Sequence, residues 1–125
     1  MQSNLNNAGA LDLLRLITSE GVRKDSPDLT ARQLAVLLTV YVTPPPHTVR
    51  GLAADLNITK PAITRALDRL TELNLIGRMR DETNKRSVLV QRTPDGMTYL
   101  NGLAEVIKTA QDQIAKSAYH IREAA

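Results

Sequence analysis

Residues 48–70 read TVRGLAADLNITKPAITRALDRL and give the clearest indication of the fold. Apolar residues recur at helical spacing from Thr48 to Leu56, which indicates a short helix. Asn57 follows as a turn residue, because asparagine tolerates the left-handed backbone of a tight corner. Thr59 then opens a second helix as its N-cap, with Pro61 acceptable in the first turn. Two short helices joined by about four residues predict a helix-turn-helix.

The second of these helices separates an apolar face from a polar one. Its outward N-terminal half carries short polar groups and cations, which suits a helix inserted into the major groove of DNA. Asn74 is expected to end the helix in the left-handed conformation. We expect Ile63, Ala66, Leu67, Leu70 and Leu73 to face inward and Lys60, Pro61, Thr64, Arg65, Asp68 and Arg69 to face outward.

A β-hairpin is predicted directly after this helix. The segments IGRMR (76–80) and SVLVQR (87–92) alternate like strands, and the charged run DETNKR (81–86) separates them. Such a hairpin with a charged tip is a wing. Thr93 and Pro94 then begin a last helix as N-cap and first helical residue, and this helix runs to about Arg122.

The helices before the helix-turn-helix are strongly apolar. Residues 8–22 form a predicted helix with leucine and isoleucine around most of its circumference, so it needs partners on several sides. A second helix starts near Thr30, and its Leu34, Leu37, Leu38 and Tyr41 share a face. Three prolines, residues 44–46, stop it and form an extended connector.

The last helix, residues 94–122, would be roughly 40 Å long, more than a domain of this size can cover. Together with helix 8–22 it predicts a homodimer, while packing inside its own monomer remains the alternative. Its apolar positions alternate three and four residues apart in a heptad-like seam: Leu100, Leu103, Ile107, Ala110, Ile114, Ser117 and Ile121.

Positive charge is concentrated in the middle of the chain. The net charge is +3 overall, whereas residues 48–92 carry nine Lys or Arg and five Asp or Glu, a net +4. A basic middle between near-neutral ends fits a module that faces a polyanion, although an ordinary solvated surface would also explain it.

Composition and motifs exclude several other classes. The chain has no cysteine, which removes disulfides and thiol chemistry and makes the cytosol the expected compartment. No run approaches the roughly 18 apolar residues of a membrane span, and the N-terminus lacks signal-peptide features, so no membrane partner is expected. His47, expected in a loop, and His120 are far apart with no clustered ligands, which argues against a metal site. No catalytic constellation, phosphate loop or cofactor motif is present, so an enzyme is not predicted.

From about Leu29 to Leu100 the sequence resembles the MarR family of bacterial winged-helix regulators. The resemblance rests on LTARQLAVL, on residues 48–70, on the following LIGR, on the wing DETNKRS and on the closing TPDG. It implies a dimer built from the first and last helices, with the helix from Thr59 of each subunit in the major groove of a palindromic operator. It also places Thr59, Lys60, Pro61, Ala62, Thr64 and Arg65 on recognition-helix positions and Lys85 and Arg86 on the basic pair of the wing.

The sequence departs from the family pattern in three ways, which concern the wing, the dimer interface and the effector pocket that the resemblance implies. Asn84 stands where an acidic residue usually precedes the basic pair, so a salt bridge that would stiffen the wing is missing. The chain is also shorter than a typical member, chiefly at its N-terminus, which points to a smaller dimer interface. Scarce aromatic residues leave little to line an effector pocket, so a small-molecule effector is doubtful.

The predicted fold is mainly α with a small β-hairpin wing: one winged helix-turn-helix domain over residues 1–125, with dimerisation helices 8–22 and 94–122 around a DNA-binding core, 30–92. The predicted function is sequence-specific binding of double-stranded DNA by a homodimeric transcriptional regulator that represses from a palindromic operator. A winged-helix adaptor that binds a protein partner is the alternative. Predicted phosphate contacts are Arg50, Arg69, Arg78, Lys85 and Arg86, and predicted base contacts are Lys60, Thr64 and Arg65.

Overall fold

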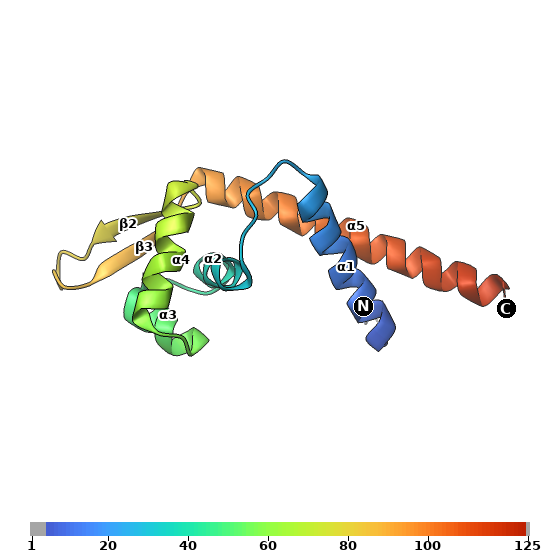
Figure 1. The fold of residues 1–125 in the computed structure, drawn as a ribbon, viewed down its shortest axis with the longest axis horizontal. Coiled ribbons are helices and arrows are strands. Elements are labelled where there is room, and N and C mark those ends of the chain that lie inside the picture. Colours follow the sequence, from blue (N-terminus) through green and yellow to red (C-terminus); the bar gives the residue numbers. More distant parts are fainter. Residues whose placement is uncertain (1–4, 125) are drawn as a thin grey trace. The chain divides into compact units, whose positions relative to one another are not determined.

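The computed structural model describes residues 5–124, with side chains up to residue 117. It is mainly helical with a small antiparallel sheet, which confirms the predicted winged helix-turn-helix fold. Its contacts form two compact units, residues 29–99 and residues 1–28 with 100–125, and each is described by itself. The elements in chain order are α1 (Asn7–Arg23), α2 (Ala31–Val42), β1 (His47–Thr48), α3 (Val49–Leu56), α4 (Lys60–Glu72), β2 (Ile76–Arg80), β3 (Val88–Arg92) and α5 (Pro94–Ala124) (Figure 1).

The core of the unit formed by residues 29–99 lies where α4 packs against α2 and α3. Removing large aliphatic side chains from water stabilises this unit by about 1.5–3 kcal/mol for each fully buried residue. Both faces of α4 match the predicted pattern. The fully buried side chains are Val36, Leu37, Val40, Leu52, Ile63, Leu67, Leu70 and Ile76.

The predicted helix starts are confirmed by side-chain caps. The hydroxyl oxygens of Thr48, Thr59 and Thr93 accept hydrogen bonds from backbone N–H groups three residues later, at 3.0, 3.2 and 2.9 Å. Each cap satisfies a donor that the first helical turn leaves without a partner. Asn57 and Asn74 both adopt left-handed backbone conformations, with φ of 53° and 58°, as predicted for the ends of α3 and α4.

The sheet has three strands, in the order β1-β3-β2, where the sequence predicted a two-stranded hairpin. β1 is only two residues long and pairs antiparallel with β3, joining His47 to Val90. The expectation that His47 lies in a loop is therefore wrong. Its side chain is 6% exposed, and its Nε2 lies 3.1 Å from the carbonyl oxygen of Thr43.

Tyr41 joins the end of α2 to the start of α5 in the unit of residues 29–99. Its hydroxyl donates to the carbonyl oxygen of Leu75 at 2.7 Å and accepts from the backbone N–H of Thr93 at 2.8 Å. Gly96 makes this close approach possible, because a Cβ there would overlap the Tyr41 hydroxyl and the Leu75 carbonyl oxygen. A glycine inside a helix is otherwise unfavourable by about 1 kcal/mol, so here it has a packing function.

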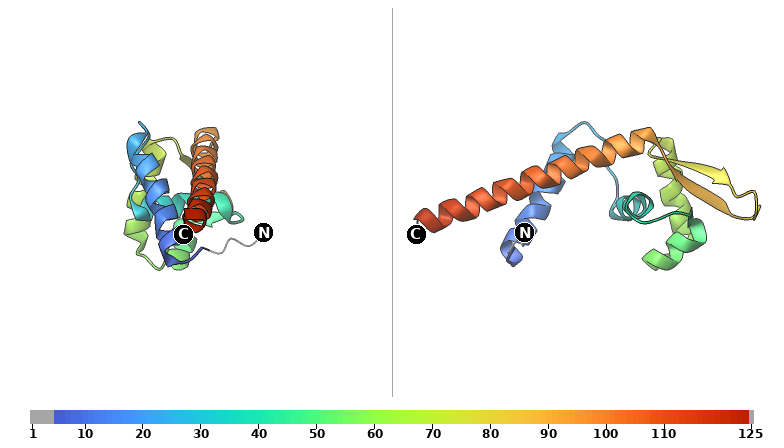
Figure 2. Two further views of the ribbon diagram at one scale, coloured as in Figure 1. Left: turned by 90° about the vertical axis from the view of Figure 1, so that its right-hand side faces the viewer. Right: turned by 180° about the vertical axis from the view of Figure 1, so that it is seen from behind.

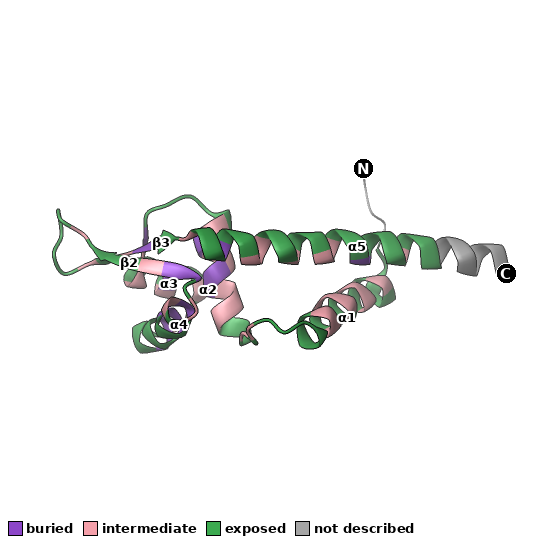
Figure 3. Ribbon diagram, turned by 90° about the horizontal axis from the view of Figure 1, so that it is seen from above, coloured by how far each residue is buried: buried purple, intermediate pink, exposed green. Residues whose placement is uncertain are grey.

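The other unit consists of α1 and of α5 from residue 100 onward (Figure 2). Ala110 is buried there, whereas no residue of α1 is buried (Figure 3). Leu11 and Leu14 on α1 are 68% and 57% exposed. Of the predicted seam, Ile121 lies outside the described side chains, Ser117 is exposed, and the remaining positions are half-buried or buried: Leu100, Leu103, Ile107, Ala110 and Ile114.

Candidate nucleic-acid interface

The N-terminal half of α4 has a continuous exposed face. Lys60, Pro61, Thr64 and Arg65 are all exposed, and the preceding N-cap Thr59 is exposed as well. The opposite face is fixed in the core by aliphatic side chains, so the rotation of the helix about its own axis is determined. This half of α4 therefore presents short polar groups and two cations to a partner.

Ala62 does not belong to this exposed face. Its side chain is 7% exposed and points into the core. This burial counts against a contact between the Ala62 side chain and DNA, where the resemblance placed Ala62 among the recognition-helix positions. Its position four residues before the buried Ala66, and eight before the buried Leu70, is the helical spacing that could have shown this from the sequence.

Intramolecular pairs divide the nine cations of residues 48–92 into two sets. Arg69 pairs with Glu72 at 3.3 Å, and Arg78 pairs with Asp68 at 2.8 Å. The Arg92 guanidinium donates to the carbonyl oxygens of Val40 and Thr43, at 3.0 and 3.1 Å. The other six form no ion pair with any residue the structure describes, and all are exposed: Arg50, Lys60, Arg65, Arg80, Lys85 and Arg86.

Arg80 was missed as a candidate for DNA contact. It lies on β2 two residues after Arg78, so both side chains leave the strand on the same face. Arg78 is held by Asp68 of α4, whereas Arg80 is exposed near the wing tip. Because side chains two residues apart on a strand lie on the same face, the segment IGRMR could have shown that both arginines lie on one face of the wing.

Hydrogen bonds within the tip shape the turn of the wing. The Asp81 carboxylate accepts from the backbone N–H and the hydroxyl of Thr83, at 3.0 and 2.7 Å. These bonds favour the charged form and hold the pKa of Asp81 below its ordinary value. Asn84 accepts from the backbone N–H of Arg86 at 3.3 Å, so the residue that departs from the family pattern still helps to form the turn.

A groove of about 800 Å³ lies between the wing, α3 and the start of α4. Arg50, Lys60 and Arg86 line it, together with the hydroxyl-bearing residues Thr48 and Ser87. None of its lining residues is acidic. The groove therefore combines three positive charges from three separate elements of the fold.

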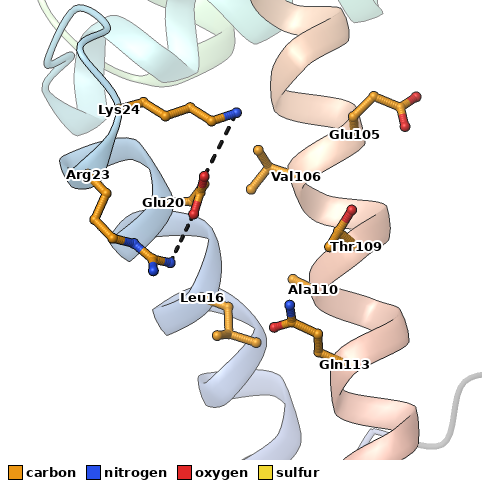
Figure 4. A pocket seen from close by; sticks show the side chains of 9 residues that line it. All are labelled: Leu16, Glu20, Arg23, Lys24, Glu105, Val106, Thr109, Ala110 and Gln113. Carbon is orange, nitrogen blue, oxygen red and sulfur yellow. Dashed lines mark ion pairs between the residues drawn. The ribbon is translucent and has the colours of Figure 1, made fainter.

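A smaller hollow of about 230 Å³ lies between α1 and α5 (Figure 4). Arg23 and Lys24 border it, but both pair with Glu20, at 2.9 and 3.9 Å. Its apolar lining comes from aliphatic residues such as Leu16 and Val106. With its cations already paired, this hollow is a poor site for an anionic ligand.

Other kinds of site find little support among the described residues. Within them, no three His, Cys, Asp or Glu side chains gather where they could hold a metal ion, and the side chain of His120 lies outside this range. No helix in the same range has the length and apolar character needed to cross a membrane.

Comparison with known proteins identifies the fold and the family. Residues 29–88 match the MarR family. A mutant of S. aureus MepR superimposes with a TM-score of 0.69 at 16% identity, covering 88% of this chain and 75% of that one. FabT of Streptococcus pneumoniae, solved in complex with DNA, superimposes with a TM-score of 0.67 at 17% identity, covering 87% of this chain and 74% of FabT. Reduced AbfR bound to DNA superimposes with a TM-score of 0.62 at 21% identity, covering 92% of this chain and 78% of AbfR. By its match over residues 29–88, the chain belongs to the MarR family of winged helix-turn-helix transcriptional regulators.

Proposed function

We propose that this protein is a homodimeric repressor that binds a palindromic operator in double-stranded DNA. The proposal rests on six exposed cations of α3, α4 and the wing that form no ion pair with any residue in the described part of the chain. Exposed positive charge that the protein does not itself neutralise is what a polyanionic partner requires. The DNA-bound structures of FabT and AbfR, which share the fold, support the same function.

The interface divides into residues that supply affinity and residues that read sequence. Arg50, Lys85 and Arg86 bind phosphates, which gives salt-dependent affinity for any duplex. Arg65 is the main candidate for base contact, because its guanidinium can form two hydrogen bonds with a guanine, and Thr64 lies beside it. Arg69 and Arg78, expected at phosphates from the sequence, have carboxylate partners within the chain and contribute less.

We infer the dimer from the apolar surface of α1. Leu11, Leu14 and Val22 are exposed large hydrophobic residues on one helix that buries none of its residues. A second copy covering this surface, with α5 contributing, would remove it from water. In this arrangement residues 8–22 and 94–122 form the dimer and residues 30–92 bind DNA, as one functional domain.

Titration of labelled duplexes tests the proposal. A pool of random duplexes is first enriched for sequences that the protein retains, and binding to the enriched duplex and to a scrambled duplex of equal length is then measured at 50 and 200 mM salt. We expect tighter binding to the enriched duplex, with half-sites about one helical turn apart, and a steep loss of affinity at high salt. Absence of binding to every duplex at low salt would refute DNA binding and favour a protein-binding adaptor.

A further inference from the structure

The groove between the wing and the helix-turn-helix brings together three cations that are far apart in the sequence. Arg50 comes from the first turn of α3, Lys60 is the first residue of α4, and Arg86 lies in the wing. Like charges that share one groove repel each other, and here no acidic lining residue offsets them. The groove is therefore positively charged and suited to an anion.

The chemistry of the lining fits a phosphodiester backbone. Guanidinium and ammonium groups are the side chains that bind phosphate oxygens, and the hydroxyls of Thr48 and Ser87 add neutral donors. The groove volume, about 800 Å³, is at the upper end of the roughly 300–1,000 Å³ of small-ligand sites. It therefore has room for a short stretch of backbone as well as a single phosphate.

Lys60 and Arg65 have different surroundings although both lie on the exposed side of α4. Lys60 lines the groove, whereas Arg65 does not. Five residues along an α-helix correspond to a rotation of about 140°, so the two side chains leave the helix in different directions. One can therefore contact the backbone while the other reaches the edges of bases.

We propose that this groove holds the phosphodiester backbone of one DNA strand, and that Lys60 is a phosphate ligand in it and not a base-reading residue. The inference rests on the proposed DNA-binding function and changes the role that the sequence suggested for Lys60. Sequence discrimination on α4 then depends on Arg65 and its neighbours. The wing and the helix-turn-helix bind the same strand, because Arg86 and Arg50 lie in the same groove.

The first test compares Lys60→Ala with the wild-type homodimer on the enriched and scrambled duplexes. We expect the same fold loss of affinity on both, so that the ratio of the two affinities is unchanged. Loss of one phosphate contact in each of the two subunits also makes the decrease in affinity between 50 and 200 mM salt about 12-fold smaller. A larger loss on the enriched duplex than on the scrambled one would overturn the role assigned to Lys60.

The second test uses duplexes in which single phosphates are replaced by uncharged methylphosphonates. Replacement at one or more adjacent positions on one strand should weaken DNA binding by the wild type. The same replacement should not change DNA binding by the triple variant Arg50→Ala, Lys60→Ala, Arg86→Ala. If the replacements lower the affinity of the wild type and of the triple variant equally at every position, the groove does not hold the backbone. Lys24→Ala, which removes an exposed cation outside the proposed DNA-binding and dimer segments, serves as the control and should bind like the wild type in both tests.

The two tests separate this inference from the proposed function. If the wild type binds no duplex, DNA binding itself fails and the inference fails with it. If the wild type binds and prefers its enriched duplex, but Lys60→Ala loses that preference, only the inference fails. Thermal unfolding of each variant by circular dichroism checks that the exposed substitutions leave the fold intact.

Discussion

Arg78 of strand β2 donates a hydrogen bond to Asp68 of helix α4, with Nη1 and Oδ1 2.8 Å apart. The pair connects the base of the wing to the helix that carries the exposed cationic face. It also neutralises the carboxylate of Asp68, which lies on the outward side of α4. Arg78 therefore has a function within the chain that the prediction of a phosphate contact did not include.

This relationship predicts a rescue. Arg78→Ala leaves the Asp68 charge uncompensated beside the DNA, so binding to all duplexes should weaken. Adding Asp68→Asn to Arg78→Ala removes that charge and should restore most of the affinity in the same titration. Stability should change by less than about 1 kcal/mol, because both side chains are partly exposed. If Asp68→Asn gives no rescue, Arg78 acts by direct contact with DNA.

Arg65→Ala should reduce sequence discrimination. Loss of a bidentate contact with a guanine costs about 1–3 kcal/mol on the preferred duplex, with a much smaller effect on a scrambled one. Arg65→Lys keeps the charge but not the planar fork, so it should restore non-specific affinity without restoring discrimination. Arg86→Ala is the counterpart and should weaken both duplexes alike. Equal losses on the two duplexes for Arg65→Ala would contradict a role in base reading.

Gly96→Ala should destabilise the protein, because a Cβ would overlap the Tyr41 hydroxyl and the Leu75 carbonyl oxygen. Overpacking of this kind costs about 1–3 kcal/mol, measured as the free energy of unfolding in urea. Gly102→Ala, in the same helix with nothing within 4 Å of the added Cβ, is the matched control. It should be neutral or stabilising by up to about 1 kcal/mol. Similar effects of the two substitutions would show that the Tyr41 contact is unimportant.

The double variant Leu11→Gln, Leu14→Gln should weaken the dimer. Both leucines are exposed on α1, and replacing them with polar residues removes apolar area that a second copy would cover. Sedimentation at several concentrations should show a shift toward monomer, with weaker binding to the full palindrome. Val42→Gln changes another exposed apolar residue, in α2, and should leave the dimer intact. An unchanged dimer in the α1 variant would exclude this surface as the interface.

The wing tip should show a measurable pH dependence. Hydrogen bonds from Thr83 lower the pKa of Asp81 below 3.8, so the carboxylate stabilises the turn at neutral pH. The stabilisation of the folded turn by the charged carboxylate is complete above the ordinary pKa of an aspartate. It is lost as the pH falls through the lowered pKa of Asp81. Thr83→Ala removes the hydroxyl donor and should raise the pKa of Asp81, followed by NMR of its side-chain carboxyl carbon. No change in that pKa would mean that the Thr83 hydroxyl does not hold the carboxylate.

Much of the fold could be predicted because its decisive interactions are local. The caps at Thr48, Thr59 and Thr93 each act on a backbone group three residues away. The left-handed turns at Asn57 and Asn74 likewise follow from the conformational preference of one residue. Strands β2 and β3 lie close together in the sequence and alternate clearly, so the hairpin was also within reach.

Other features depend on residues that only the folded chain brings together. A two-residue strand is too short to show alternation, so β1 became recognisable only through the pairing of His47 with Val90. The nine cations between residues 48 and 92 can be counted in the sequence, but the sequence does not show which of them form ion pairs within the protein. Asp68 and Arg78 are ten residues apart and meet because β2 turns back beside α4.

The order of the helices and strands, their ends and the apolar face of α4 follow from the amino-acid sequence alone, because caps, turns and hydrophobic periodicity act over a few residues. Which cations are available to a partner, and the meeting of Arg50, Lys60 and Arg86 in one groove, depend on the folded chain. Ion pairs and grooves join side chains from separate elements, and packing of the core sets their distances.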